Sequence, residues 1–523
     1  MNEALLIHFD NTPLVTRVAD SIKFNPSMED LNNSDIDTFI SKQIIPKIQE
    51  KNFKVIIIKD TLSENYIDFY GLVLSYHIRL SSNILGDKSF SPIIILSDIN
   101  EFIINKLTNY GKILFTKNTF LVENSIDSIE DVKFLNFQLL NKNEFEEQFT
   151  NKISIEPPQD YLSHHSIANE WSIYNWANIL NVKSDVITKN QTDIENMLYF
   201  KYLNALTEQK EKKQFKIKKV PKKPKGKGKI LFIDDEWNKG WSDILNKVIS
   251  KDGIEFKTFE YDFNDKTKFN LYMKIQKEII DFKPDLVVLD LRLAQSDHED
   301  DNINNYTGVK ILEKIHEINA GIQIIMLTAT SKSTTLERLY EKKILGYIKK
   351  EHPNDVMLNT IDNINKLVDL VDKGCEKRYL IKVWNIQASI LSLNVFKTQN
   401  NIYKKILFEV SNIFNILDSN LEKKVTFFVL AVYNIIEIIV KDFGYKEGSA
   451  FKNIINICNE KLNLYGFDEK LSQLICTRNY LIHLDDDIKY HCKDNTIKKP
   501  TNENIVEWFN MIDVILKGFN QVK

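Results

Sequence analysis

The chain has 523 residues, enough for three or four domains of ordinary size, and 43% of them are hydrophobic, so each domain can bury a core. Its 69 basic and 72 acidic side chains nearly cancel, which excludes a general attraction to nucleic acid but not a local basic patch. The four cysteines form neither a disulfide framework nor a zinc ribbon, and the most apolar stretch, residues 425–440, is too short to span a membrane. With no secretory signal in the first residues, we expect a cytoplasmic protein in a reducing compartment, outside the membrane.

Residues 1–124 alternate short apolar runs with longer amphipathic segments. The runs cover residues 4–10, 55–60, 92–98 and 112–117. Runs of this length and spacing are typical of strands joined by helices, and they predict a first α/β domain with a mainly parallel sheet.

A second region, residues 125–228, is less regular and contains a dense polar and aromatic cluster. The cluster comprises His164, His165, Asn169, Glu170 and Trp171. A histidine pair can bind metal or move protons, but adjacent residues on a helix point about 100° apart and cannot easily ligate one ion. We expect a packed structural segment, to which no chemistry can be assigned.

The second region ends in a lysine-rich segment, residues 211–229, with ten lysines and two prolines. Its charge, prolines and glycines predict a linker between domains. The alternative is a contact with an RNA phosphate backbone, because clustered lysines bind phosphates.

Residues 229–352 form a third region, and three carboxylates stand at the ends of its apolar runs. Asp234 and Asp235 follow the first run, and Asp290 ends the next one. The carboxyl ends of parallel strands share one edge of a sheet, where three carboxylates repel one another unless a cation such as Mg²⁺ intervenes.

Two further polar residues stand at the same predicted edge. Thr328 ends a third run, and Lys350 follows the last one. A hydroxyl and an ammonium group there could hold the oxygens of a phosphoryl group carried by Asp290 as an acyl phosphate.

The segments IDDE, VVLDLRL, MLTAT and GYIKK, in this order over about 120 residues, resemble the receiver domain of two-component response regulators. The resemblance implies a flavodoxin-like doubly wound parallel sheet, Asp290 as phosphoacceptor, and a histidine kinase or a phosphotransfer protein as partner. It further implies Thr328 and Lys350 as phosphoryl-sensing residues and Tyr347 as the switch aromatic. The implied Mg²⁺ ligands are Asp234, Asp235, Asp290 and the backbone carbonyl of Arg292.

Two features depart from the receiver pattern. Glu351 stands where a proline usually follows the lysine, so the local backbone is expected to differ. The loop after Asp290 is long and acidic, and it is a candidate gate of the pocket or selector of the kinase. Its acidic residues are Asp297, Glu299, Asp300 and Asp301.

The first region repeats part of this pattern. The polar residues at its predicted strand ends are Asp10, Asp60, Ser97 and Lys117. The second and third of these are 37 residues apart, against 38 for the corresponding pair of the third region. Asn11 replaces the main metal-binding aspartate, so we predict a degenerate receiver-like domain that has weakened or lost phosphorylation and serves as an interaction surface. The alternative is an ordinary doubly wound domain with polar strand ends.

From residue 353 onward we expect only helices: connecting helices over 353–398 and a helical domain over 399–523. In the segment LSQLICTRNYLIHLDDD, Asn479 and His483 share one helix face, and Arg478 lies five residues before the histidine. Imidazole is a natural general acid or base, and guanidinium stabilises charge on a phosphate. The set therefore suits metal-independent attack of a ribose 2′-hydroxyl on the neighbouring phosphate.

The string RNYLIH resembles the R-x4-H motif of HEPN domains, which are all-helical folds that include many RNases. The resemblance implies Arg478 and His483 as catalytic residues, the following asparagine as their support, an RNA substrate and a homodimer that brings two motifs together. The alternative is a surface arginine and a capping histidine, with Glu437 facing Arg478 in a structural ion pair. His491 and Cys492 beside the motif offer too few ligands for a convincing zinc site.

Together these features predict a multidomain fold with two doubly wound α/β domains followed by a helical HEPN-like bundle. We expect a signalling effector in which phosphorylation of Asp290 controls a metal-independent endoribonuclease, in a setting such as phage defence. The rival interpretation is a non-enzymatic scaffold in which phosphorylation controls dimerisation of the helical domain or its recruitment of a partner. A transcription factor is less favoured, because no helix-turn-helix or basic recognition helix follows the receiver-like region.

Overall fold

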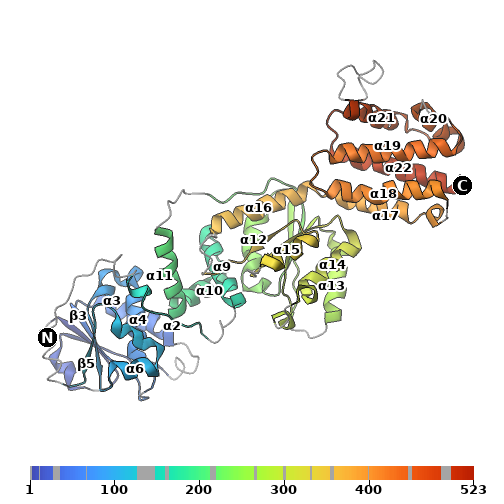
Figure 1. Ribbon diagram of the computed structural model, residues 1–523. Coiled ribbons are helices and arrows are strands. Elements are labelled where there is room, and N and C mark those ends of the chain that lie inside the picture. Colours follow the sequence, from blue (N-terminus) through green and yellow to red (C-terminus); the bar gives the residue numbers. More distant parts are fainter. Residues whose placement is uncertain are drawn as a thin grey trace. The chain divides into compact units, whose positions relative to one another are not determined.

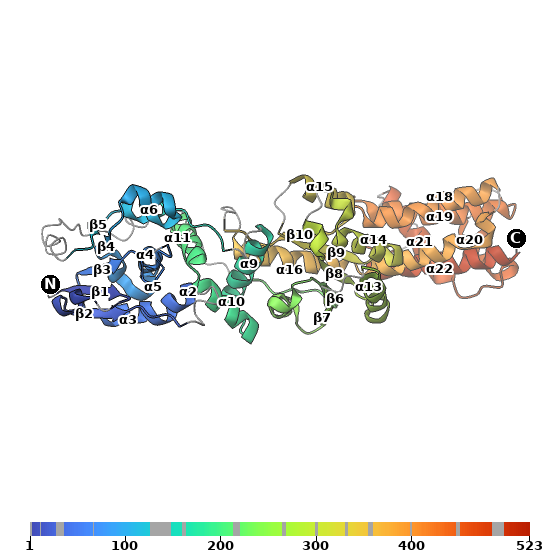
Figure 2. The same cartoon turned by 90° about the horizontal axis from the view of Figure 1, so that it is seen from below.

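The computed structural model covers residues 1–523 and is shown in Figure 1 and, from below, in Figure 2. The residues that the structure describes are 3–10, 12–27, 36–65, 67–125, 148–158, 164–212, 220–263, 268–298, 302–329, 333–353, 359–397, 400–445, 450–483 and 496–522. The chain divides into two compact units. The first contains residues 1–221, 238–244 and 350–363, and the second contains residues 222–237, 245–349 and 364–523.

A five-stranded parallel sheet forms the N-terminal part of the first unit. Its strands are β1 (Ala4–His8), β2 (Asp20–Lys23), β3 (Val55–Lys59), β4 (Ile93–Ser97) and β5 (Thr119–Glu123). Their order is β2-β1-β3-β4-β5, and every neighbouring pair is parallel. The three inner strands are runs of buried apolar residues, as expected for strands that are covered on both faces.

Clusters of buried apolar side chains lie on both faces of this sheet and include residues from the surrounding helices. The helical elements described in this unit up to residue 212 are η1 (Pro13–Arg17), α2 (Ile36–Phe39), η2 (Ile40–Ile44), α3 (Ile45–Glu50), α4 (Tyr70–Leu80), α5 (Ser82–Leu85), η3 (Gly86–Phe90), α6 (Glu101–Leu107), η4 (Asn109–Phe115), α9 (His164–Leu180), α10 (Asp185–Asn196) and α11 (Leu198–Lys212). The helices α9 to α11 belong to the region that the sequence left without a fold assignment.

The fourth apolar run of the first region, residues 112–117, is not a strand. Most of it lies in the 3₁₀ helix η4, which Thr108 caps by accepting a hydrogen bond from the backbone N–H of Tyr110 (3.3 Å). The last strand begins at Thr119, so Lys117 precedes this strand instead of following it. The prediction was wrong because a short apolar run has too little periodicity to separate a strand from a tight helix. The sequence pattern also did not predict β2, a short edge strand with one buried residue.

A buried polar network joins α2, η2, α4 and α11 in the first unit. His77 Nε2 lies 2.9 Å from Asp37 Oδ1, and His77 Nδ1 lies 3.2 Å from Lys201 Nζ. Lys201 also donates to the hydroxyls of Ser41 (2.9 Å) and Ser81 (3.2 Å). Burial lowers the pKa of Lys201 to about 8, and burial together with the charge of Lys201 lowers the pKa of His77. The network therefore ties α11 to the helices beside the sheet.

The stability of the first unit is expected to fall as the pH drops below about 6.5. The unfolded chain protonates His77 near pH 6.5, whereas the folded chain keeps this imidazole neutral to lower pH, so the unfolded state binds more protons just below pH 6.5. The contribution of neutral His77 to the free energy of unfolding is full above pH 6.5. It is lost as the pH falls, by at most about 1.4 kcal/mol per pH unit. Urea unfolding followed by tryptophan fluorescence measures this slope. His77→Gln should flatten it, and a slope that this substitution leaves unchanged would contradict the prediction.

A second five-stranded parallel sheet lies in the second unit. Its strands are β6 (Gly228–Ile233), β7 (Ile254–Thr258), β8 (Leu286–Asp290), β9 (Gln323–Thr328) and β10 (Gly346–Lys349). The order β10-β9-β8-β6-β7 is the order of the first sheet, read from the opposite edge. The prediction of two doubly wound parallel sheets is confirmed.

Helices alternate with the strands of this second sheet. They are η7 (Trp237–Lys239), α12 (Trp241–Ile249), α13 (Lys268–Phe282), η8 (Gln295–His298), η9 (Ile303–Asn305), α14 (Thr307–Asn319), α15 (Ser333–Glu341) and α16 (Thr360–Glu376). A Cβ on Gly346 of β10 would meet the side chain of Leu370 at 2.7 Å, so α16 packs closely on this strand. The helix α16 is therefore the last helix of the second α/β domain.

The end of the lysine-rich segment lies along α16. Lys222 forms an ion pair with Asp369 (2.9 Å), and the backbone N–H of Gly226 donates to Asp372 (2.8 Å). This part of the predicted linker is held by partners that lie about 147 residues later in the chain. Residues 213–219 of the same segment lie outside the described residues.

Residues from α17 onward form a helical bundle. Its helices are α17 (Tyr379–Leu391), η10 (Asn394–Lys397), α18 (Asn401–Asp418), α19 (Lys424–Asp442), α20 (Ala450–Asn456), η11 (Ile457–Lys461), α21 (Asp468–His483) and α22 (Asn502–Val522). In Figure 1 α17, α18, α19 and α22 run alongside one another, and their apolar faces share one core. As predicted, the described part of the chain from residue 359 onward contains no strand. Because α17 belongs to this core, the bundle begins before residue 399.

The most apolar stretch of the sequence, residues 425–440, lies in α19. Its buried residues, which include Phe428 and Ile436, pack in the core of the bundle. In the parts of the chain that the structure describes, no helix combines the length and the apolarity needed to cross a bilayer.

Candidate functional site

Three aspartates meet at the carboxyl ends of β6 and β8, which are neighbours in the second sheet. Asp234, Asp235 and Asp290 each offer a carboxylate oxygen, and these oxygens all lie within 4.8 Å of one another. Asp234 and Asp290 are 0% and 1% exposed, whereas Asp235 is half-buried. Carboxylates this close repel one another, so a hard divalent cation such as Mg²⁺ fits the donor set.

Backbone amides hold the two most buried carboxylates. The N–H of Glu236 donates to Asp234 Oδ1 (2.8 Å), and the next two N–H groups of the chain lie 2.5 and 3.4 Å from Asp290 Oδ1. The Arg292 side chain donates to the hydroxyl of Tyr306 (3.0 Å) and stacks on its ring, with 4.9 Å from the guanidinium to the ring centroid. The Arg292 side chain is therefore engaged with Tyr306, and its backbone carbonyl stays a predicted ligand.

The predicted phosphoryl-sensing residues lie at the ends of the last two strands. Thr328 ends β9, is buried and pairs in register with Lys349 of β10. Lys350 follows β10 directly and is fully buried, with its ammonium group 5.4 Å from the ring centroid of Trp241. An ammonium group over an indole face is stabilised by a cation–π interaction.

Tyr347, the predicted switch aromatic, lies on β10 between two side chains. Its ring packs edge-on against Tyr340 of α15, with 5.9 Å between the centroids. The ammonium group of Lys366 of α16 lies 4.1 Å from the same ring. A rotation of Tyr347 would break both interactions, so this side chain connects β10 with two helices of the domain.

The acidic loop after Asp290 is held in its conformation by hydrogen bonds to one of its own residues. Asp297 is buried, and its carboxylate accepts hydrogen bonds from the N–H groups of Leu293 (3.0 Å) and Ala294 (3.1 Å) and from the hydroxyl of Thr307 (3.0 Å). Asp297 therefore fixes the conformation of the loop, and the role of the loop as a gate or kinase selector stays a prediction. The other acidic residues, Glu299, Asp300 and Asp301, lie outside the described residues.

Glu351, the departure from the expected proline, is a buried carboxylate that is 4% exposed. Its Oε1 accepts hydrogen bonds from Trp176 Nε1 (2.9 Å) and Asn363 Nδ2 (3.2 Å), and its Oε2 accepts one from Thr360 Oγ1 (2.6 Å). Its backbone N–H donates to the hydroxyl of Ser172. The partner on α9 lies 175 residues earlier, so no local sequence pattern could have revealed this cluster.

Glu351→Ala is expected to destabilise the first unit by about 2–4 kcal/mol, because three buried donors lose their acceptor. Glu351→Gln keeps one carbonyl oxygen as an acceptor and should cost less. Urea unfolding followed by tryptophan fluorescence measures both changes. The control Glu341→Ala removes an exposed carboxylate of α15 and should change stability by less than about 0.5 kcal/mol. Wild-type stability of Glu351→Ala would contradict the prediction.

The polar and aromatic cluster of α9 is a packed structural segment, as predicted. Asn169 is fully buried, and its Oδ1 accepts a hydrogen bond from Trp241 Nε1 (2.6 Å). Trp176 packs edge-on against the same indole, with 5.6 Å between the centroids. The side chains of His164 and His165 lie outside the described residues.

The first sheet places a buried aspartate, Asp60, directly after β3. Asp60 Oδ1 accepts a hydrogen bond from the next backbone N–H (2.7 Å), and Oδ2 accepts one from the hydroxyl of Ser97 (2.5 Å). Asp10 pairs with Lys59 at 3.7 Å, and Asn11 lies outside the described residues. Over the described residues, only the second sheet gathers three acidic, histidine or cysteine ligands.

A glycine packs against the corresponding strand end in both sheets. A Cβ on Gly71 of α4 would lie 1.9 Å from the carbonyl oxygen of Lys59, and one on Gly308 of α14 would lie 2.3 Å from that of Asp290. The lysine position is not shared, because Asn124 follows β5. The two domains therefore repeat one backbone design, but the first lacks a lysine after its last strand.

The C-terminal motif lies on α21. Arg478 Nη1 donates to Asn479 Oδ1 (3.0 Å), and the guanidinium lies 4.5 Å from the ring centroid of Tyr433 on α19. Burial and the charge of Glu437 raise the pKa of Tyr433, and the charge of Arg478 opposes them. Glu437 and Arg478 thus act on the same tyrosine, and the described residues contain no ion pair between the two. His483 ends the helix, and its side chain lies outside the described residues.

Three of the four cysteines lie among the described residues, and Cys476 of α21 is disulfide-bonded. Cys375 and Cys458 are free and buried, and burial raises their pKa values to about 11 and about 12. His491 and Cys492, considered above for zinc, lie outside the described residues.

A comparison with known families bears on the first sheet. Residues 12–122 match the family model described as Inactive Receiver domain. The N-terminal domain is receiver-like and of the inactive type. This match confirms the prediction of a degenerate receiver-like domain, and it agrees with a first sheet that gathers no acidic cluster over its described residues.

Solved structures similar to this chain include three proteins, each 16% identical to it. One is the signal receiver domain of a modulated diguanylate cyclase from Desulfovibrio desulfuricans G20, with coverage of 28% of this chain and 98% of that chain and a TM-score of 0.18. Another is NtrX from Brucella abortus, with coverages of 36% and 41% and a TM-score of 0.19. The third is the response regulator StyR, with coverages of 47% and 98% and a TM-score of 0.20. No curated protein matches the chain significantly.

The family match supports a receiver-domain signalling protein. Receiver domains in general interact with kinases or phosphotransfer proteins, so we expect a partner of this general class.

Proposed function

We propose that this protein is a phosphorylation-regulated signalling effector with Asp290 as its phosphoacceptor. The observation that carries the proposal is the cluster of Asp234, Asp235 and Asp290 at the carboxyl ends of β6 and β8. A carboxylate oxygen of Asp290 attacks the phosphorus of a phosphohistidine on a histidine kinase or a phosphotransfer protein. A P–O bond forms, the P–N bond breaks, and the departing imidazole takes up a proton.

The aspartates of the cluster and the backbone carbonyl of Arg292 would hold Mg²⁺. When bound, the ion supplies positive charge that neutralises the phosphoryl oxygens. The hydroxyl of Thr328 donates to one phosphoryl oxygen, and the buried ammonium of Lys350 pairs with another. Tyr347 follows the movement of Thr328 and changes its packing against α15 and α16.

Hydrogen bonds connect the second α/β domain to the helical bundle and offer a route for this signal. Asn319 at the end of α14 donates to the carbonyl of Ile381 (3.1 Å) and to Asn385 Oδ1 (2.9 Å), both on α17. Lys343, which precedes β10, donates to Asn415 Oδ1 of α18 (3.2 Å). Phosphorylation changes this interface and thereby the geometry of a bundle homodimer.

The output that we propose is metal-independent cleavage of RNA by Arg478, Asn479 and His483. His483 takes the proton of a ribose 2′-hydroxyl, whose oxygen attacks the adjacent phosphorus. The bond to the 5′-oxygen breaks, this oxygen takes up a proton, and a 2′,3′-cyclic phosphate remains. Arg478 stabilises the negative charge that grows on the phosphate, and Asn479 orients Arg478 through their hydrogen bond. A role in phage defence suits such an activity, and the inactive receiver provides an interaction surface.

A non-enzymatic scaffold is the second candidate. It is favoured by large apolar side chains that the bundle leaves exposed, among them Leu421 (53%) and Phe427 (45%). Exposed apolar groups on helices suit recruitment of a partner or dimerisation.

RNA cleavage by the purified full-length protein tests the proposed function. The assay is run first without divalent metal and then with Mg²⁺ and beryllium fluoride, a mimic of the phosphoryl group. Cleavage without metal that changes with the mimic in the wild type, but not in Asp290→Ala, would support a receiver-gated RNase. Binding of the mimic without cleavage under any condition would favour the scaffold.

A further inference from the structure

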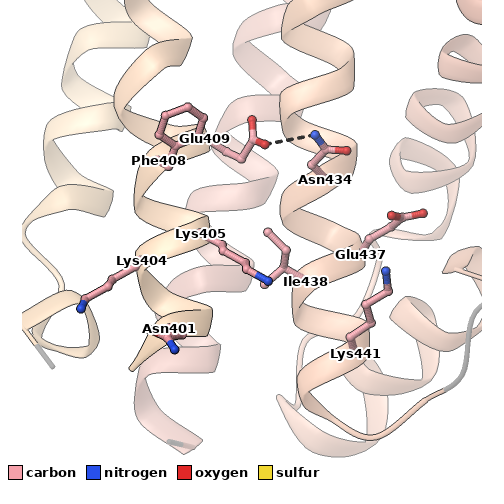
Figure 3. Close-up of a pocket in the computed structure, with 9 residues that line it drawn as sticks. All are labelled: Asn401, Lys404, Lys405, Phe408, Glu409, Asn434, Glu437, Ile438 and Lys441. Carbon is pink, nitrogen blue, oxygen red and sulfur yellow. Dashed lines mark hydrogen bonds between the residues drawn. The ribbon is translucent and has the colours of Figure 1, made fainter. Parts of the chain in front are cut away.

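We propose that the groove between α18 and α19 binds single-stranded RNA. The groove has a volume of about 570 Å³ and is open along the surface of the bundle. Figure 3 shows side chains from both helices around it. The inference rests on the proposed RNA-directed function of the bundle, and it names the surface that would hold the strand.

Three lysines line this groove, Lys404 and Lys405 on α18 and Lys441 on α19. The side chains of Lys404 and Lys405 form no ion pair with any described residue and are exposed. Of the two glutamates nearby, Glu409 accepts a hydrogen bond from Asn434 (3.1 Å), as Figure 3 shows. The three lysines and two glutamates of the lining sum to a net charge of +1, whereas the whole chain carries −3. The exposed ammonium groups of Lys404 and Lys405 match a polyanion.

An aromatic ring stands beside the lysines. Phe408 is 66% exposed, although burying such a side chain is worth roughly 2 kcal/mol. It lies four residues after Lys404 and three after Lys405, so its ring is close to both lysines along α18. In Figure 3 the ammonium group of Lys405 points toward α19 and that of Lys404 points away from it. A base can stack on such a ring only where it is not paired in a duplex. Interleaved cations and aromatic rings are typical of surfaces that bind single strands without sequence preference.

The groove is adjacent to the predicted catalytic arginine. Glu437 lines the groove, and it is one helical turn after Tyr433, on whose ring Arg478 stacks at 4.5 Å. The charge of Glu437 also acts on the Tyr433 hydroxyl. A strand held by Lys404, Lys405 and Phe408 therefore runs beside the part of α19 on which Arg478 packs.

Fluorescence anisotropy of a labelled oligouridine, titrated with the full-length protein at several salt concentrations, tests this assignment. Lys404→Glu combined with Lys405→Glu should weaken binding at least 10-fold at low salt, and it should reduce the salt slope by about one for each phosphate that the variant no longer neutralises. Phe408→Ala should weaken binding about 5- to 100-fold while leaving the salt slope unchanged, because stacking is not ionic.

The matched control is Lys452→Glu combined with Lys461→Glu, two exposed lysines on α20 and η11 that do not line the groove. This control should bind the oligouridine as the wild type does. The assignment is overturned if the groove variants bind as the wild type, if the control weakens binding equally, or if duplex RNA or an acidic peptide binds better than the single strand.

The assay separates this inference from the RNase proposal. If RNA binding depends on the groove but no RNA is cleaved, the RNase proposal is contradicted and the groove assignment is supported. If the groove variants cleave RNA at the wild-type rate, the groove assignment is contradicted and the RNase proposal is supported.

Discussion

Asp290→Asn is expected to abolish phosphorylation of this protein. Asp290 is the buried carboxylate at the end of β8, with two other carboxylates within 4.8 Å to hold Mg²⁺. An amide cannot act as the nucleophile, so no acyl phosphate forms. Incubation with a small phosphoryl donor such as acetyl phosphate, followed by intact-mass measurement, should add one phosphoryl group to the wild type and none to the variant. Chelation of divalent metal should stop the reaction in the wild type as well.

Asp60→Asn is the matched control, because it removes the corresponding aspartate of the inactive receiver. Asp60 already accepts a hydrogen bond from the hydroxyl of Ser97 (2.5 Å), and the first sheet gathers no acidic cluster over its described residues. This variant should take up one phosphoryl group at the wild-type rate. Loss of phosphorylation in Asp60→Asn, or equal labelling of Asp60 and Asp290, would show that the N-terminal domain is not degenerate.

Arg478→Ala and His483→Ala are each expected to lower the rate of RNA cleavage by at least about 100-fold. The imidazole supplies general acid–base catalysis, and the guanidinium supplies charge stabilisation in the transition state, each typically worth 100-fold or more. Arg478→Lys keeps the charge but loses the planar fork, so it should retain part of the activity. The measurement is single-turnover cleavage of a labelled single-stranded RNA without divalent metal.

Lys470→Ala is the control for these variants, because Lys470 is an exposed cation on the same helix. It should cleave at the wild-type rate. The circular dichroism melting curve of Arg478→Ala shows whether removal of the guanidinium from the Tyr433 ring disturbs the bundle. Equal cleavage by the wild type and His483→Ala would point to a contaminating nuclease and would remove the case for a catalytic motif.

Local patterns were sufficient for most of the strands and for the acidic edge. Strands covered on both faces must be continuous apolar runs, and β1, β3, β4, β6, β8 and β9 are such runs. Because parallel strands end at one edge, the sequence positions of Asp234, Asp235 and Asp290 implied their proximity. The same argument failed at residues 112–117, where a capped 3₁₀ turn buries Ile113 and Leu114 much as a strand would.

Interactions between distant segments were beyond the reach of local patterns. The acidic residues of the loop after Asp290 looked alike in the sequence, and only the folded loop made Asp297 its internal acceptor. Likewise, Glu351 was visible only as a departure from a family pattern, and its donors come from α9 and α16.

By itself, the sequence determined two α/β domains, a helical C-terminal region and a cluster of three aspartates at the strand ends of the second sheet, because strand periodicity and strand-end positions are local properties. The tertiary structure alone decided how α9 packs on Trp241 and Glu351, how Lys222 pairs with α16, and how lysines from two helices line one groove. Such interactions join residues far apart in the chain. Their partners are selected by the packing of whole elements, which no short window of sequence contains.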